Sequence, residues 1–206
     1  MRRLAAAAVC LIGLLALPAG CNRATDTAKT DDQPPPGPLP RDDDGLAARL
    51  TQTGQVDRYS LSLPPDYAAV PMQGRPQLEL AAWSAKAADG RPVGVVSAAV
   101  FSDPKLVADA GKGMRQTLVN YSAGVTDSSG CKITARGPTR TNTAGGLDVT
   151  RFAFEGTGPD GTPMKGVTFG AIDGDRVVTA VAAGFGDAAA EQARLFEAVA
   201  DSLRKK

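Results

Sequence analysis

Histidine is absent from this sequence of 206 residues, and only three cysteines and one tryptophan are present. Imidazole is the usual general base of serine and cysteine hydrolases and a frequent ligand of zinc and haem iron, so sites of these kinds are excluded. Aromatic residues make up only 5% of the chain, whereas 23 glycines and 15 prolines provide many turn positions. The remaining composition, 43% hydrophobic and 22% charged, is that of a globular protein, and the length allows one domain with appendages.

The apolar stretch at the N-terminus is too short to be a transmembrane helix. It runs from Leu4 to Leu17, which is fourteen residues, and follows Arg2 and Arg3. A helix needs about 20 apolar residues to cross a bilayer. A basic start, a short apolar stretch and small residues after it are typical of a secretory signal peptide, which we place at residues 1–20.

The four residues Pro18-Ala19-Gly20-Cys21 resemble the lipobox of bacterial lipoproteins. In that family small residues precede a cysteine that is diacylated, with palmitate for example, and becomes the mature N-terminus; an aliphatic residue usually stands where this chain has Pro18. The resemblance implies that Cys21 is lipidated and that the protein is anchored to a membrane of the bacterial cell envelope. Asn22 follows the cysteine where family members kept at the inner membrane usually have Asp, which favours the outer membrane in a Gram-negative cell. The alternative is an ordinary signal peptide, with no lipid on Cys21.

Residues 21–45 have the composition of a disordered linker. They are rich in proline and aspartate, contain almost no apolar residues, and carry six acidic against three basic side chains. Such a segment cannot form a core and is expected to be an extended spacer. The remaining residues 46–206 carry eighteen basic and sixteen acidic residues. This balance is too weakly basic for a nucleic-acid-binding protein.

Hydrophobic periodicity in residues 46–206 predicts one domain that is mostly sheet. Alternating or continuous apolar segments between turn residues are typical of strands, and apolar residues at spacings of three and four are typical of helices. Helices are expected over 103–121, capped by Asp103, and over 187–203, capped by Asp187, with a short helix over 46–53. In the first helix Leu106 begins one buried apolar stripe, and Arg204 and Lys205 are expected at the negative end of the second. We predict strands at Tyr59–Leu63, Gln77–Ser84, Pro92–Phe101, Cys131–Arg136, Gly146–Glu155, Pro163–Ile172 and Asp175–Ala183.

This element order predicts an α+β fold, in which a twisted antiparallel sheet of about six to seven strands is packed by a middle helix and a C-terminal helix. The phrase Tyr59-Ser60-Leu61-Ser62-Leu63-Pro64-Pro65-Asp66-Tyr67 then resembles the opening strand of PsbP-like and DcrB-like domains. Those domains share the order of elements over about residues 55–206. The resemblance implies an extrinsic or lipid-anchored binding or assembly factor, and it implies no shared catalytic residues.

Two single residues and one group of basic residues are the remaining candidates for chemistry. Cys131 is the only thiol after Cys21; beside Lys132 it is either a reactive thiolate or, as free cysteines usually are, a small buried hydrophobic residue. Trp83 is either a stacking platform or a core anchor. The basic residues predicted on the sheet form either a docking patch or a solvated face mixed with acids. They are Lys132, Arg136, Arg140, Arg151, Lys165 and Arg176.

Three functions follow as hypotheses. The first is a non-catalytic lipoprotein whose domain binds another envelope protein or assists assembly. The second is a small-ligand or lipid carrier with an apolar cavity between sheet and helix. The third is an enzyme that uses Ser-Lys or carboxylate chemistry, for which no motif is recognisable. We expect no catalytic residues, cofactor or metal.

Overall fold

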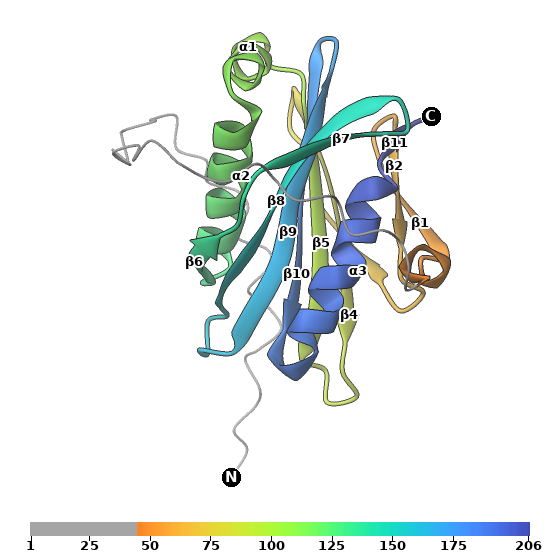
Figure 1. Ribbon diagram of the computed structural model, residues 1–206, viewed down its shortest axis with the longest axis vertical. Coiled ribbons are helices and arrows are strands. Elements are labelled where there is room, and N and C mark those ends of the chain that lie inside the picture. Colours follow the sequence, from red (N-terminus) through yellow and green to blue (C-terminus); the bar gives the residue numbers. More distant parts are fainter. Residues whose placement is uncertain (1–44) are drawn as a thin grey trace.

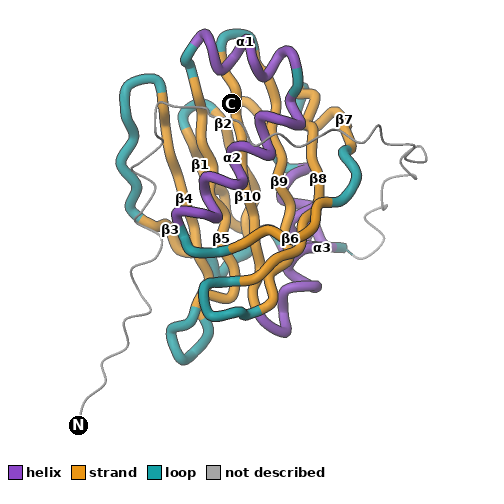
Figure 2. The backbone as a smooth tube through the Cα atoms, turned by 90° about the vertical axis from the view of Figure 1, so that its left-hand side faces the viewer, coloured by secondary structure: helices purple, strands orange, loops and turns teal. Residues whose placement is uncertain are grey.

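The computed structural model describes residues 45–206. The predicted signal peptide, the linker up to residue 44 and the predicted lipidation site Cys21 lie outside the described residues. The described chain forms three layers (Figures 1 and 2): helices α1 and α2 cover one face of a large sheet, and helix α3 with a small sheet covers the other. The predicted α+β class with an antiparallel sheet is confirmed.

The helical segments are η1 (Leu46–Arg49), α1 (Pro104–Lys112), α2 (Met114–Ser128), η2 (Gly186–Ala188) and α3 (Ala189–Asp201), where η denotes a 3-10 helix. The strands are β1 (Gln52–Val56), β2 (Tyr59–Leu63), β3 (Ala68–Val70), β4 (Leu78–Lys86), β5 (Pro92–Phe101), β6 (Lys132–Arg136), β7 (Arg140–Ala144), β8 (Leu147–Thr157), β9 (Pro163–Asp173), β10 (Arg176–Phe185) and β11 (Arg204–Lys205).

The large sheet has eight strands in the order β3-β4-β5-β10-β9-β8-β6, with β7 also paired to β8. All of its strand pairs are antiparallel, and the predicted hairpin at Asp173-Gly174 joins β9 to β10, with Asp173 opposite Arg176. A second sheet has the order β1-β2-β11. The large sheet therefore has more strands than the expected six to seven, because it includes two short strands, β3 and β7, that were not predicted.

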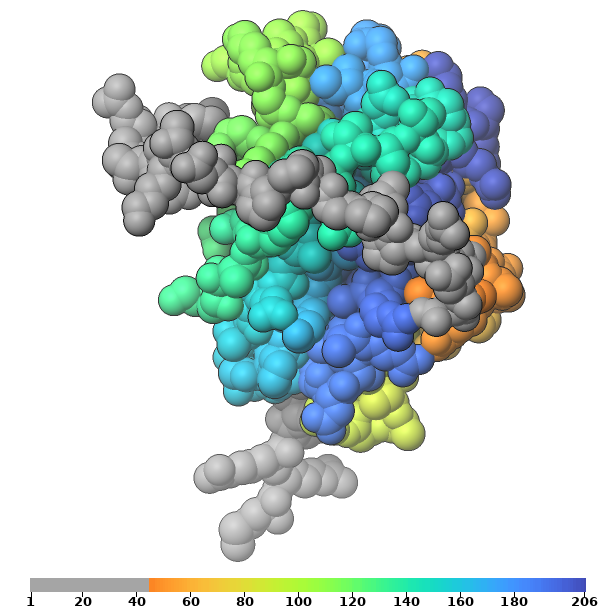
Figure 3. Space-filling view, viewed as in Figure 1, coloured from red at the N-terminus to blue at the C-terminus, as the bar shows by residue number. Residues whose placement is uncertain are grey.

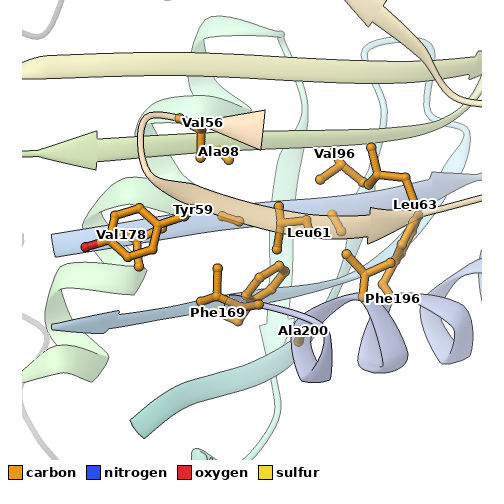
Figure 4. Close-up of a cluster of buried hydrophobic side chains, with 14 of the residues drawn as sticks. Val56, Tyr59, Leu61, Leu63, Val96, Ala98, Phe169, Val178, Phe196 and Ala200 are labelled. Carbon is orange, nitrogen blue, oxygen red and sulfur yellow. The ribbon is translucent and has the colours of Figure 1, made fainter. Parts of the chain in front are cut away.

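The main core lies between the large sheet and the layer formed by α3 and the small sheet. Leu61 and Leu63 of β2 face Phe169 of β9 and Phe196 of α3, and all four are buried (Figure 4). The rings of Tyr67 and Phe196 meet edge to face, with centroids 6.3 Å apart. Trp83 is 7% exposed in the same cluster, so its role as a core anchor is confirmed.

Helix α2 approaches the opposite face of the sheet closely because β9 has a glycine beneath it. A Cβ atom on Gly170 would lie 2.8 Å from Cε of Met114, 3.1 Å from Cδ2 of Leu118 and 2.4 Å from the carbonyl oxygen of Val178. No side chain fits in that space without displacing the backbone. The glycine therefore sets how closely α2 packs on the sheet.

The predicted single helix over 103–121 is wrong, because the structure has two helices there. Asp103 does cap α1, and its carboxylate accepts hydrogen bonds from the backbone N–H groups of Lys105 and Leu106. Gly113 then takes an extended conformation, with φ −174° and ψ 88°, and α2 begins at Met114. The break changes the direction of the chain, so the predicted apolar stripe is not continuous.

The two ends of the domain also differ from the prediction. The helix expected over 46–53 is one 3-10 turn, and β1 follows because Gly54 lets the chain pack against Trp83, whose Cζ2 would lie 2.7 Å from an added Cβ. Asp187 does not cap α3; it lies inside η2. Arg204 and Lys205 were expected to end the helix, but they form β11 and pair with Ser60 and Tyr59 of β2.

We predict opposite effects for two Gly→Ala substitutions. Gly170→Ala should lower the free energy of unfolding by about 1–3 kcal/mol, because the added methyl overpacks the α2 interface. Gly111→Ala should raise it by up to about 1 kcal/mol, because this α1 position has open space and Ala favours helix. Urea denaturation measures both, and a Gly170→Ala variant as stable as the wild type would contradict the packing argument.

Candidate functional site

Cys131 is the only candidate cysteine within residues 45–206. It is half-buried and packs with Tyr121 and Ile133 against a cluster that includes Phe154 and Met164. Its surroundings are therefore largely apolar, as expected for a cysteine that serves as a small hydrophobic residue. Cys21 lies outside the described residues, so its lipidation stays a prediction.

The six basic residues predicted on the sheet do not gather into one patch. Lys132 and Arg136 are exposed on β6, at the end of the sheet. Three of the others pair with acids: Lys165 with Glu155, Arg176 with Asp57, and Arg151 with two carboxylates of α3. Arg140 stands opposite Arg151 in the β7–β8 register. The interpretation as charges interspersed with acids fits this arrangement better than a docking patch.

Arg151 anchors α3 to the sheet. Its side chain is 3% exposed; Nη1 lies 2.7 Å from Oδ1 of Asp201 and also donates to the carbonyl oxygen of Glu197, and Nε lies 3.2 Å from Oε2 of Glu197. Asn142 donates a second hydrogen bond to Asp201. Burial raises the pKa of Glu197, while the charges of Arg151 and Arg140 oppose that rise. A buried cation held by two carboxylates forms structural ion pairs. Arg151, Glu197 and Asp201 are therefore already paired with one another.

Asp173 joins three parts of the chain at the end of the sheet where β9 turns into β10. Its carboxylate accepts hydrogen bonds from the Tyr59 hydroxyl at 2.7 Å and from Arg58 at 2.9 Å, both in or beside β2, and from Lys205 of β11 at 3.1 Å. The Tyr59 hydroxyl, together with Lys205 and Arg58, holds the pKa of Asp173 below its usual value. Burial raises the pKa of Tyr59 to about 12. The network links the β9–β10 hairpin to the small sheet and the C-terminal strand.

Exposed apolar side chains mark the same end of the molecule. Leu106 of α1 is 43% exposed and Ile172 of β9 is 38% exposed. Within residues 45–206 these two are the exposed large hydrophobic side chains. Figure 3 shows α1 and the β9–β10 hairpin side by side at this end. An open hollow of about 270 Å³ lies between the start of α2, β8 and β9 and is lined by Met114, Asp148, Thr150 and Ile172. This end, which we call the α1 end, is the candidate interaction surface.

The α1 end was not predicted from the sequence. Leu106 was expected in a buried stripe, but the break at Gly113 separates α1 from α2 and leaves Leu106 exposed. Ile172 was expected in a strand, which is correct, and its position directly before the Asp173-Gly174 turn places it at the edge of the layered core. The sequence does contain a signal for this exposure: Gly111 and Gly113 flank Lys112, and glycine disfavours a continuous helix.

Within residues 45–206, no three Cys, Asp or Glu side chains come together as a metal site would require. In the same part of the chain, every helix is too short or too polar to cross a membrane.

Comparisons with known proteins give a match by structure and none by sequence. No family model matches this chain, and no curated protein matches it. The solution structure of cyanobacterial PsbP (CyanoP) from Synechocystis is similar, with a TM-score of 0.52 and 14% identity, over 72% of this chain and 87% of that chain. The chain therefore has a PsbP-like fold, as its opening strand suggested.

Two further solved structures match at lower TM-scores. LpqN, described as involved in cell envelope biogenesis of Mycobacterium tuberculosis, has a TM-score of 0.41 and 14% identity, over 71% of this chain and 82% of that chain. A crystal structure from Bacteroides thetaiotaomicron has a TM-score of 0.43 and 13% identity, over 72% of this chain. This chain spans 45% of the length of the Bacteroides protein.

We predict that Arg151→Ala destabilises the fold by about 3 kcal/mol, because it leaves the Glu197 carboxylate partly buried without its cation. The matched control is Lys165→Ala, which removes an exposed partner of Glu155 and should cost less than about 1 kcal/mol. Chemical denaturation at pH 7 compares the two. Equal losses would mean that Arg151 does not anchor α3.

We predict that Asp173→Asn makes the fold less sensitive to acid. A carboxylate with a lowered pKa stabilises the folded state above its unfolded pKa, and this stabilisation is lost as the pH falls through the folded pKa. The free energy of unfolding of the wild type should therefore fall more steeply below about pH 4 than that of Asp173→Asn. Asp175→Asn, at a largely exposed side chain, is the control and should follow the wild type. A control that loses as much acid sensitivity as Asp173→Asn would contradict this assignment.

Proposed function

We propose that this protein is a lipid-anchored lipoprotein of the bacterial cell envelope whose folded domain is a non-catalytic module that binds another envelope protein. In this proposal Cys21 carries the lipid, residues 22–45 form the spacer, and the α1 end of the domain contacts the partner. The outer membrane is the favoured location in a Gram-negative cell.

The tether is supported by the sequence before the domain. A short apolar stretch, a lipobox-like cysteine and a linker rich in proline and aspartate occur in that order. Acyl chains on one cysteine bind a membrane with about 0.8 kcal/mol for each buried CH₂, so two or three chains are an adequate anchor. The domain itself then needs no membrane-spanning part.

A non-catalytic role is supported by how the charged groups of the domain are used. Arg151, Glu197 and Asp201 hold α3 on the sheet, and Asp173 holds the small sheet and the C-terminal strand. Each of these groups already has a structural partner, and none lines the hollow at the α1 end. Groups with shifted pKa values often mark active sites. Here their positions match a role in holding layers together.

One observation carries the docking part of the proposal: Leu106 of α1 and Ile172 of β9, the second of which lines the hollow, are both more than a third exposed at the α1 end. Apolar side chains grouped at one place on a surface favour a protein contact. Single exposed residues elsewhere would carry no such meaning. The lysines of α1, Lys105 and Lys112, are exposed and give this apolar centre a polar rim.

The alternative function, a carrier of a small ligand or lipid, has weaker support. The space between α3 and the sheet is filled by buried side chains such as Phe169 and Phe196. The hollow of about 270 Å³ beside α2 is open and falls below the usual size of ligand pockets, which is roughly 300–1,000 Å³. The docking function is therefore the one that we propose.

Lipid attachment is tested by intact-mass analysis after expression of the full chain in a bacterium that makes lipoproteins. We expect a mature protein that begins at Cys21 and carries acyl chains, recovered in the membrane fraction. Cys21→Ser should lose the acyl mass and the membrane association. Cys10→Ser, within the predicted signal peptide, is the matched control and should behave as the wild type. An unmodified mass in the wild type would overturn the lipoprotein assignment.

Docking is tested by site-specific crosslinking in cells. A photoreactive residue at position 105 should crosslink the domain to one partner, and the double variant Leu106→Ser/Ile172→Ser should reduce the yield at least tenfold. The same photoreactive residue at position 91, in the exposed β4–β5 turn, should give no such product. A product of equal yield in the double variant would show that the apolar side chains of the α1 end do not bind the partner.

A further inference from the structure

The hollow at the α1 end has two apolar and two polar walls. Thr150 of β8 stands directly opposite Gly170 of β9, the glycine that lies beneath Met114 of α2. Side chains alternate between the two faces of a sheet, so Asp148 and Ile172, each two residues along its strand, share this face with Thr150. The four side chains line the hollow where α2 begins and leaves the ends of β8 and β9 uncovered.

Asp148 is held in position by the neighbouring strand but has no cation beside it. Its Oδ1 accepts a hydrogen bond at 3.0 Å from the hydroxyl of Thr143, which is its partner in the β7–β8 register. Asp148 is exposed, and within residues 45–206 it forms no ion pair. Other carboxylates at this end are paired with cations: Asp57 with Arg176, Asp109 with Lys112, and Asp173 with Arg58 and Lys205.

A protein that covers this hollow has to bring a positive charge to it. Covering Asp148 removes its carboxylate from water, and a carboxylate in a covered site is unfavourable without a counter-charge. The basic side chains of α1 do not supply that charge, because neither of its lysines lines the hollow and Lys112 is already paired with Asp109. The charge must therefore come from the partner.

The walls of the hollow suit a long basic side chain. Lysine and arginine carry a charged head on an aliphatic stem, and the stem packs on apolar groups while the head stays at a polar one. Met114 and Ile172 provide the apolar walls, and Asp148 provides the polar group. The open volume of about 270 Å³ is smaller than a usual ligand pocket but admits a side chain from another protein.

We propose that the hollow receives a lysine or arginine side chain of the envelope protein that docks at the α1 end. The stem of that side chain packs between Met114 and Ile172, and its charged head pairs with Asp148. This inference rests on the docking function proposed above. It adds that the partner presents a basic residue with apolar neighbours, because Leu106 and Ile172 are exposed at the same end.

Crosslinking with the photoreactive residue at position 105 tests the charge. Asp148→Asn keeps the size of the side chain and the acceptor for Thr143, so the urea denaturation midpoint should not change, while the yield of crosslinked product should fall about fivefold or more. Asp148→Lys should lower the yield further, by about tenfold or more, because two like charges then meet. The matched control is Asp127→Asn, at an exposed carboxylate at the other end of α2, which should give the wild-type yield.

Salt and a charge exchange separate an ion pair from a merely polar contact. In isolated membranes, raising NaCl from about 0.05 M to about 0.5 M should lower the yield for the wild type and change it little for Asp148→Asn. Mass spectrometry of the crosslinked peptide identifies the basic residue of the partner. Changing that residue to aspartate should restore the yield lost in Asp148→Lys.

The outcomes distinguish this inference from the docking function itself. A yield that falls in Leu106→Ser/Ile172→Ser but not in Asp148→Asn would overturn the basic side chain and leave docking in place. An equal loss in Asp127→Asn would also overturn it, because the attraction would then be general and not centred on the hollow. No crosslinked product from the wild type would overturn both proposals.

Discussion

Burial of the large sheet on both faces is the constraint on which the rest of this structure depends. A sheet with one face in water can alternate apolar and polar residues, but β5 and β10 are buried along most of their length. Their sequences are accordingly runs of valine, alanine and glycine with a few small hydroxyl residues. Small side chains keep the layers thin, which is why Gly170 allows α2 to approach so closely.

The layers on the two faces are held in different ways. On one face, aromatic and aliphatic side chains pack around Phe169, and charged groups at the margins, Arg151 and Asp173, fix α3 and the small sheet. On the other face, α2 packs closely over Gly170, and its Tyr121 packs on an apolar cluster that includes Phe154 and Met164. The exposed apolar residues Leu106 and Ile172 lie at the end of this second side.

A domain with exposed apolar residues at one end suits a tethered binding protein. The spacer and anchor that we propose would bring the domain to a membrane surface without using any of its core. The domain would then contribute a surface and no reaction chemistry, which agrees with charged groups that serve packing. The PsbP-like fold by itself carries no function, because one fold supports many different sites.

Most elements of the fold could be predicted from the sequence because their signals are local. Alternation predicted β2 and β4, continuous apolar runs predicted β5 and β10, and Asp173-Gly174 predicted the hairpin between β9 and β10. The short strands were missed: β3 has three residues, and β7 is polar, although Gly145-Gly146 after it is a hairpin signal with positive φ at both residues. The extra strand β11 exists only because β2 offers an edge for Arg204 and Lys205.

By itself, then, the sequence determined the α+β class, the order of most elements and the exclusion of imidazole chemistry, because periodicity and composition act over neighbouring residues. Only the tertiary structure decided which charges are buried and which apolar residues are exposed. From the sequence alone Arg151 would be predicted on the surface, but α3 covers it. Leu106 would be predicted in the core, but the break at Gly113 separates α1 from α2 and leaves it exposed. Both outcomes depend on contacts between residues far apart in the chain, whose relative positions a local pattern does not specify.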